Sequence, residues 1–183
     1  MTGLNVNKHT VYTINNFRYK NFIDLTEDEI RMVWEWRNAP EVRLSMYNKD
    51  GIPYDSHVKY IENLKNRDDR YYWLVYKNEE ALGVIDLVDV DESRTKAEFG
   101  YYLQPESQNS GEGLNFVYAT FKLFFQLGIE ILESSVNIEN KKAIVIDKYF
   151  GCKFEDANIF ELNGEKYIPF GLQKMVFLKK FKL

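Results

Sequence analysis

Apolar residues recur along the chain with two different periods, and the changes of period divide it into strands and helices. Runs typical of strands cover residues 17–25, 71–76, 82–90, 97–103, 129–137, 153–162 and 167–178. Helical spacing follows Thr26, starts again near Asp55 or Ser56, runs from Leu114 to Phe125, and returns from Asn140 to Gly151. A helix that joins two neighbouring strands makes a parallel crossover, so the order predicts a mixed α/β (α+β) fold. We expect a mostly antiparallel central sheet of about seven strands flanked by about four helices.

Short motifs fix several boundaries of these elements. Thr26 and Glu29 form a capping box, in which a hydroxyl and a carboxylate satisfy free N–H groups at a helix start. Pro40 ends that helix, because the residue before a proline avoids the helical conformation. Gly128 is placed to end the third helix, and Asn163-Gly164 predicts a hairpin between the last two strands.

The composition is that of one folded domain. A chain of 183 residues with 45% hydrophobic and 16% aromatic residues has enough apolar material for a single core. We expect the domain to span residues 17–183, preceded by a loose polar arm, or a short edge strand, at residues 1–16. The net charge of −4 disfavours a nucleic-acid partner, which requires a basic face.

Cysteine content and hydropathy bear on the compartment. Cys152 is the only cysteine, so no internal disulfide can form, and a reducing cytoplasm fits. Residues 1–12 lack the apolar stretch of a signal peptide, and Lys122 and Gln126 interrupt the most apolar helix. We therefore expect a cytoplasmic protein without a membrane segment or a metal site. The sequence is compatible with a homodimer and leaves the oligomeric state open.

The segment from Gln108 to Leu114 joins a strand to an amphipathic helix. Gly111 and Gly113 let the backbone approach a ligand closely, and the first N–H groups of a helix attract anions. The spacing is not the dinucleotide fingerprint, since the third glycine is missing, and not a P-loop, since no Lys-Ser or Lys-Thr follows. We expect a pyrophosphate at this loop, although similar glycines also occur in loops that bind nothing.

The pattern Gln-x-x-Gly-x-Gly between a strand and a long helix resembles the acetyl-coenzyme A (acetyl-CoA) loop of the GNAT acetyltransferase superfamily. The preceding run from Ala97 to Leu103, followed by Pro105, is similar to the central strand of that superfamily. The resemblance implies the GNAT fold and acetyl-CoA as co-substrate. The cofactor-binding residues that it implies are Leu103, Gln108, Gly111, Glu112, Gly113, Asn140 and Ala143.

The stretch from Asn140 to Ile144, with Gly151 after it, resembles a second GNAT segment. In the superfamily its Asn binds the pantetheine arm and its Ala lets the helix lie against the cofactor, whereas Asn140 also fits a plain helix cap. Many members carry a tyrosine seven residues after that Asn, which protonates the departing thiolate, and here Asp147 stands there. An Asp can act as this acid only if burial raises its pKa.

The chemistry that the resemblance implies is direct attack of an amine on the thioester, with a backbone N–H polarising the carbonyl. The amine must first lose a proton, and His57 and Glu98 are the candidate bases. A histidine titrates near neutrality, and a carboxylate on a strand can act through water. Both residues also fit structural roles, Glu98 on a sheet face and His57 as a hydrogen-bonding group at a helix start.

The first third of the chain resembles the N-acetyltransferases of pseudaminic acid biosynthesis, which acetylate the 4-amino group of a UDP-linked amino sugar. The similar segments include Trp36-Arg37-Asn38, Met46-Tyr47, and His57 with Tyr60. The resemblance implies that Met46, Tyr47 and Tyr60 pack against the nucleobase and that Arg37 and His57 face the diphosphate. Arg37 suits an anion because a guanidinium forms paired hydrogen bonds, whereas Met46 and Tyr47 also fit a core role.

Two other functions stay open. Protein N-terminal acetyltransferases share much of the Arg-Asn and His pattern, so the acceptor can also be a peptide amine. Asp147 in place of the tyrosine also fits a degenerate domain that binds an acyl-CoA without turnover.

Overall fold

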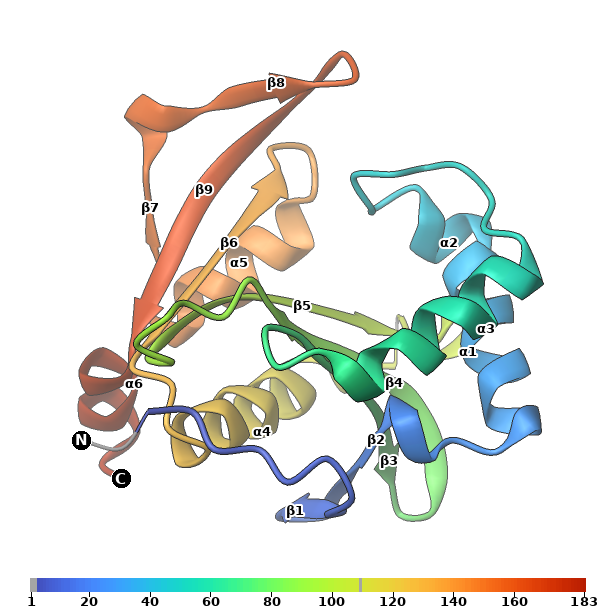
Figure 1. The fold of residues 1–183 in the computed structure, drawn as a ribbon. Helices are drawn as coiled ribbons and strands as arrows, with labels where there is room; N and C mark the ends of the chain where they lie inside the picture. The colour runs from blue at the N-terminus through green and yellow to red at the C-terminus, as the bar shows by residue number, and fades with distance from the viewer. Residues whose placement is uncertain (1–2, 109) are drawn as a thin grey trace.

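The computed structural model describes residues 3–108 and 110–183, which form one open, twisted sheet with helices on both faces (Figure 1). In these residues the sheet has nine strands in the order β1-β2-β3-β4-β5-β6-β9-β7, and β8 pairs with β9. The strands are β1 Tyr12–Ile14, β2 Phe17–Asn21, β3 Tyr71–Lys77, β4 Glu80–Val88, β5 Lys96–Leu103, β6 Ile131–Asn137, β7 Lys153–Phe154, β8 Phe160–Leu162 and β9 Glu165–Gln173. The α-helices are α1 Glu27–Asn38, α2 Pro40–Arg43, α3 Tyr54–Asn63, α4 Gly113–Gln126, α5 Lys141–Phe150 and α6 Lys174–Phe181.

The neighbouring strands β5 and β6 are parallel and are joined through α4, which is the predicted crossover. The other strand pairs are antiparallel. Only Lys96–Glu98 of β5 pairs with β6, at Ile131–Glu133, although both strands continue. Beyond Glu98 the two strands no longer pair and leave a wedge between them.

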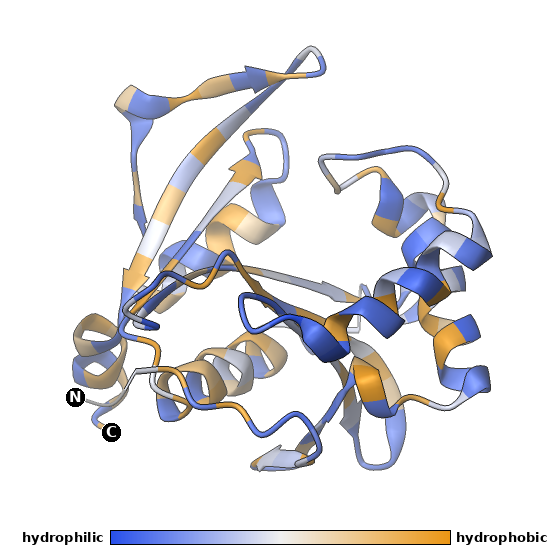
Figure 2. Cartoon of the chain, in the orientation of Figure 1, coloured by the Kyte–Doolittle hydropathy of each residue, from blue (hydrophilic) through white to orange (hydrophobic). Residues whose placement is uncertain are grey.

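Apolar clusters cover both faces of the sheet, as the orange segments of the helices and strands in Figure 2 indicate. On one face, Phe116, Phe121 and Phe124 of α4 and Phe177 of α6 are fully buried in the larger cluster. On the other face, α1 and α3 pack a smaller cluster over β3 and β4. Apolar residues recur with the helical period on the helices, and successive side chains on the strands point to opposite faces of the sheet. Each helix therefore buries one face against the sheet, which produces this three-layer arrangement.

The motifs read from the sequence place most helix ends correctly. Thr26 and Glu29 form the predicted capping box at α1, and Ala39 ends that helix before Pro40. Gly128 follows α4 with φ of +110°. The helix α3 differs from the prediction: it begins at Tyr54 after Pro53, and no side chain of Asp55 or Ser56 caps it.

The fold class is confirmed, while several element limits differ from the prediction. The run 17–25 is strand only to Asn21, whose side chain accepts a hydrogen bond from the N–H of Ile23 and starts a 3-10 turn. The run 153–162 is broken into β7 and β8 by another such turn. The run 167–178 contains the end of β9 and the start of α6, because Phe177 and its helical neighbours bury one stripe against α4.

Within residues 3–108 and 110–183, the longest apolar helix falls short of what crossing a bilayer requires. Buried Leu4 packs into the larger cluster, and its N–H donates to the backbone carbonyl of Arg94. The segment before β1 is therefore attached to the turn between β4 and β5.

Candidate active site

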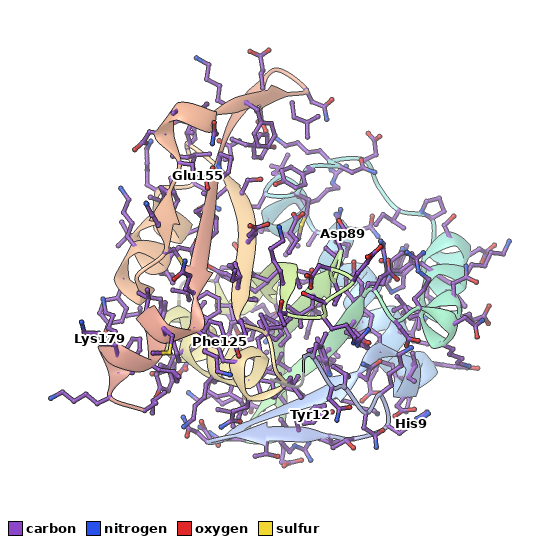
Figure 3. The ribbon with its side chains drawn as sticks, turned by 60° about the vertical axis from the view of Figure 1, so that its left-hand side comes forward. His9, Tyr12, Asp89, Phe125, Glu155 and Lys179 are labelled. Carbon is purple, nitrogen blue, oxygen red and sulfur yellow. The ribbon has the colours of Figure 1, made fainter. Side chains whose placement is uncertain are left out.

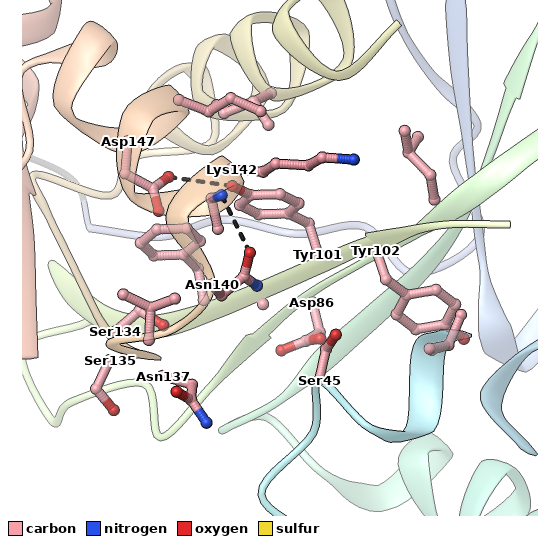
Figure 4. A pocket seen from close by; sticks show the side chains of 18 of the residues that line it. Ser45, Asp86, Tyr101, Tyr102, Ser134, Ser135, Asn137, Asn140, Lys142 and Asp147 are labelled. Atoms are coloured by element: carbon pink, nitrogen blue, oxygen red, sulfur yellow. Dashed lines mark hydrogen bonds between the residues drawn. The ribbon is translucent and has the colours of Figure 1, made fainter. Parts of the chain in front are cut away.

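A cavity of about 470 Å³, here called the central cavity, fills the wedge between β5 and β6 (Figure 4). Its walls are residues 99–103 of β5, residues 134–137 of β6, the start of α4 and the inner face of α5. Where the two strands part, their facing backbone groups no longer pair with each other. The wedge therefore offers backbone N–H and C=O groups to an extended ligand between the strands.

The predicted anion loop lies at the end of this wedge. Gly111 has φ of +81°, and a Cβ placed on it would meet nothing within 4 Å, so the loop leaves open space for a ligand. The helix α4 begins at Gly113 without a side-chain cap, which leaves its first N–H groups for an outside acceptor. Of the predicted loop residues, Gln108 and Gly113 line the central cavity, while Gly111 and Glu112 do not. Asn109 lies outside the described residues.

Glu112 has a structural partner that the sequence did not reveal. Its Oε2 accepts a 2.5 Å hydrogen bond from Nζ of Lys77, at the end of β3. The ion pair ties the loop to the sheet and neutralises a carboxylate that would otherwise repel an anion at the start of α4.

Asn140 and Ala143 both line the central cavity from the start of α5. Oδ1 of Asn140 accepts a hydrogen bond of 3.2 Å from the N–H of Ala143, so the N-cap interpretation of Asn140 is confirmed (Figure 4). Leu103 lies opposite on β5. Five of the seven predicted cofactor-binding residues thus line one cavity, and Gly111 and Glu112 do not.

Asp147 lies one turn beyond Ala143, with only 1% of its surface exposed. Its Oδ1 accepts a hydrogen bond of 3.1 Å from the hydroxyl of Tyr101 on β5 (Figure 4). Burial raises the pKa of Asp147 to about 7, and the hydrogen bond from Tyr101 opposes that rise. An Asp at this position can act as the acid only if its carboxyl keeps a proton near neutral pH, and the raised pKa of Asp147 meets that condition.

A second cavity of about 360 Å³, here called the side cavity, lies between α1, α3 and the β3–β5 part of the sheet. Three of the five residues that the sequence predicts at the acceptor site line it, namely Arg37, His57 and Tyr60, whereas Met46 and Tyr47 do not. Nη2 of Arg37 donates to the backbone carbonyl of Asn48 at 3.1 Å. Nη1 of Arg37 and Nε2 of His57 are buried and have no hydrogen-bond partner among the described residues. Buried polar atoms of this kind call for a ligand or water as partner.

The two candidate bases differ in environment. Burial lowers the pKa of His57, and the nearby Arg37 guanidinium lowers it further, against a hydrogen bond with the backbone of Ile30 that raises it. The imidazole is therefore neutral at pH 7. Burial raises the pKa of Glu98, and the carboxylates of Asp89 and Glu133 add to the rise; Asp89 lies just beyond β4 (Figure 3). Glu98 lines the central cavity and His57 the side cavity, so the two bases do not share one cavity.

The segment between α2 and α3 carries two further predicted residues. The hydroxyl of Tyr47 is hydrogen-bonded to Ser135 of β6, and its ring packs against Tyr167 of β9 at 5.0 Å. Tyr47 thus crosses the mouth of the central cavity, which it lines. Met46 is half-buried and lines neither cavity, so the structure does not bring it together with Arg37, His57 and Tyr60.

The sequence reasoning missed Asp86, Tyr72 and Tyr102, which line both cavities. Asp86 interrupts the otherwise apolar strand β4, and a carboxylate at such a position was the available signal. The two tyrosines look like ordinary core residues in sequence, so only the fold identifies them as part of the site.

Residues 21–153 match the family described as Acetyltransferase (GNAT) domain. The acetyltransferase PseH of Campylobacter jejuni serotype O:2 is 30% identical over 146 residues, which are 78% of this chain and 90% of that protein. The serotype O:23/36 form of the same protein is 28% identical over 148 residues.

Solved structures show the same fold. The C. jejuni PseH structure in complex with acetyl coenzyme A matches with a TM-score of 0.64 and 24% identity, over 86% of this chain and 99% of that one. A spermidine N-acetyltransferase from Vibrio cholerae, in complex with CoA and spermine, matches with a TM-score of 0.78 and 16% identity, over 90% of this chain and 99% of that one.

Proposed function

The chain belongs to the GNAT acetyltransferase family and is an N-acetyltransferase, and we propose that it transfers acetyl from acetyl-CoA to the amine of a nucleotide-linked amino sugar. The PseH relatives and the acetyl-CoA complex of one of them support this proposal. The observation that carries it is the side cavity, where a guanidinium, Arg37, and a carboxyl group, Asp86, both line the wall.

The central cavity fits acetyl-CoA. The open space at Gly111 and the uncapped start of α4 suit the pyrophosphate, with Gln108 and the first N–H groups of α4 as its contacts. Asn140, Ala143 and Leu103 line the wedge in which a pantetheine arm would lie between β5 and β6. Acetyl-CoA supplies the activated acetyl group, and the residues of the chain hold it and exclude water.

The side cavity fits an acceptor that carries both an amine and an anion. Arg37 presents a buried, unpartnered Nη1, which suits a diphosphate oxygen, and Asp86 suits an ammonium group. Neutral His57 can donate one hydrogen bond to the same anion, from the ring nitrogen that carries its proton. Tyr60 offers an aromatic ring for a nucleobase in the side cavity, and Tyr47 offers another from the central cavity. In this proposal Met46 contributes to the nucleobase contact only if its segment moves inward.

A polyamine is a less suitable acceptor, although a spermidine acetyltransferase has the same fold. Each amine of such a substrate is a cation, and the Arg37 guanidinium in the same cavity would repel it. A peptide with a free N-terminus remains the second candidate among acceptors, because it also carries one amine and polar backbone groups.

The chemical step is direct attack. The acceptor amine loses a proton to a base, with His57 and Glu98 as the bases expected from sequence, and attacks the acetyl carbonyl carbon. A backbone N–H of β5 in the wedge polarises the carbonyl oxygen. The carboxyl of Asp147, kept protonated by burial, gives its proton to the departing sulfur and is recharged by solvent.

The test measures thiol release from acetyl-CoA with a panel of UDP-linked amino sugars, short peptides and spermidine. Turnover with the UDP-amino sugars at a kcat/KM at least about tenfold above the other acceptors supports the proposal. Turnover with peptides alone assigns the chain to protein N-terminal acetylation. Acetyl-CoA binding without turnover of any acceptor contradicts the enzyme proposal and leaves a binding module.

A further inference from the structure

The side chain of Asp86 lies where the central cavity and the side cavity meet. Asp86, Tyr72 and Tyr102 line both cavities, so these three side chains form the boundary between them. They come from three adjacent strands, with Asp86 of β4 directly opposite Tyr72 of β3 and Gly100 of β5. Figure 4 shows Asp86 beside Tyr102, separate from the Tyr101–Asp147 pair.

Gly100 provides the space that the carboxylate occupies. A Cβ at Gly100 would lie 3.0 Å from Oδ1 of Asp86 and 2.7 Å from its Oδ2, and the second distance is shorter than real Cβ contacts allow. A glycine inside a strand weakens the strand, and one reason to keep it is the close approach of another group. Here that group is the Asp86 carboxylate, which any larger residue at position 100 would displace.

The surroundings of Asp86 suit proton uptake near neutral pH. Burial raises its pKa to about 7, the carboxylate of Glu98 adds to the rise, and the backbone of Gly100 and the Arg70 guanidinium oppose it. The other titratable groups on the side cavity are Arg37 of α1, His57 and Tyr60 of α3, Tyr72 and Tyr102. Burial raises the pKa values of Tyr72 and Tyr102, so both phenols stay neutral.

We propose that Asp86 receives the ammonium group of the acceptor at the junction of the two cavities and accepts the proton that must leave before the amine attacks. The inference rests on the proposed function, because it places the acceptor in the side cavity and the thioester in the central cavity. In that arrangement the base must reach both cavities. Asp86 lines both, whereas Glu98 does not line the side cavity and His57 does not line the central one.

The proton balance of the step is simple. One N–H bond of the ammonium breaks and its proton moves to a carboxylate oxygen of Asp86, which passes it to solvent. The free amine forms the N–C bond with the acetyl carbon, and the C–S bond breaks with its electron pair on sulfur. The nitrogen loses its second proton as the amide forms, and the sulfur gains one, so one proton is released for each acetyl group transferred.

The experiment compares the wild type with Asp86→Asn, Asp86→Glu, Gly100→Ala and Asp156→Asn. The last is the matched control, because Asp156 is an exposed carboxylate that lines neither cavity. Each protein is assayed for kcat and kcat/KM against pH with the best UDP-amino sugar, and for its melting shift with acetyl-CoA, which reports folding and cofactor binding.

Asp86→Asn is expected to lose about 10²- to 10⁴-fold in kcat and the rise in rate near pH 7, while keeping the melting shift. Asp86→Glu is expected to regain part of the rate and the pH dependence, Gly100→Ala to lose rate, and Asp156→Asn to match the wild type. If the kcat of Asp86→Asn stays within about threefold of wild type with the same pH profile, the role of Asp86 is overturned, while the proposed function still stands. A wild type that binds acetyl-CoA but turns over no UDP-amino sugar overturns the proposed function itself.

Discussion

The hydroxyl of Tyr101 on β5 donates a 3.1 Å hydrogen bond to Oδ1 of Asp147 on α5, across the wedge from one wall to the other. Burial raises the pKa of the Tyr101 phenol well above its usual range, and the nearby Asp147 carboxyl raises it further, so Tyr101 keeps its proton and acts as a fixed donor. The bond orients Asp147 and stabilises its charged form after a proton has left. A buried carboxyl with one such donor is therefore suited to losing and regaining a proton.

The raised pKa of Asp147 makes the stability of the protein depend on pH. Between pH 4 and 7 the folded state holds a proton on Asp147 that the unfolded state has lost, so this residue lowers stability as the pH rises through that window. The gap between 3.8 and about 7 corresponds to about 4 kcal/mol. We expect the stability difference between Asp147→Asn and wild type to shift in favour of the variant as the pH rises from about 4 to about 7, the limits of that window. Urea melts at both pH values measure it, and a difference that does not change with pH would contradict the assignment.

Activity tests the same residue separately. If Asp147 protonates the departing thiolate, Asp147→Asn should lower kcat, and the decline of the wild-type rate above about pH 7 should disappear. Asp147→Tyr places a phenol, a weaker acid than the carboxyl, at the position and should restore part of the rate with the decline moved to higher pH. Steady-state kinetics between pH 6 and 9, roughly the range in which these groups titrate, provides the measurement. Wild-type pH profiles in both variants would show that Asp147 is not the acid.

The loop at Gly111 offers a matched pair of glycines for testing cofactor binding. Gly111 and Gly164 have φ of +81° and +78°, and a Cβ on either would meet nothing within 4 Å. Substitution by Asp should therefore cost a similar amount at both, about 1–2 kcal/mol. Acetyl-CoA at about 100 times its Kd should stabilise the wild type and Gly164→Asp by roughly 2.7 kcal/mol, and Gly111→Asp far less, because the new carboxylate repels the pyrophosphate. Equal melting shifts in the two variants would place the cofactor elsewhere.

Local motifs were enough to predict the fold class, because each acts on its own backbone neighbours. The capping box at Thr26, the glycine after α4 and the cap at Asn140 all hold in the structure. The C-terminal helix was missed because residues 167–178 are rich in apolar and β-branched or aromatic types that suit either element, and packing against α4 decides the outcome.

The site was predictable only in part, and for a different reason. Loop and helix-start residues such as Gln108 and Asn140 carry a spacing pattern, whereas Asp86 and Gly100 meet through strand register, which sequence periodicity does not specify. The pairing of Glu112 with Lys77 likewise joins residues 35 positions apart. Contacts of this kind depend on how the strands pair in the complete sheet, so they cannot be predicted from local sequence motifs.

Arg37 should contribute to acceptor binding rather than to chemistry. Its buried Nη1 lacks a partner among the described residues, and Arg37 lines the side cavity, so a diphosphate there would gain a charge-assisted hydrogen bond. Arg37→Gln should raise the KM for a UDP-amino sugar by about tenfold or more, with kcat changed little. Arg31→Gln, on the exposed side of the same helix, is the control and should leave KM unchanged. A fall in kcat without a change in KM would contradict the binding role.

Cys152 should be inert in the folded protein, which bears on every thiol-release assay. Its side chain is 7% exposed, and burial together with the neighbouring Asp147 raises the pKa of the thiol, so little reactive thiolate is present at pH 8. An aromatic disulfide reagent should therefore label the native protein much more slowly than free CoA, and should label one thiol per chain after denaturation. Absorbance of the released aromatic thiolate follows both reactions. Rapid labelling of the native protein would mean that the packing around the end of α5 opens readily, and Asp147 would then lose the burial that keeps its proton in place.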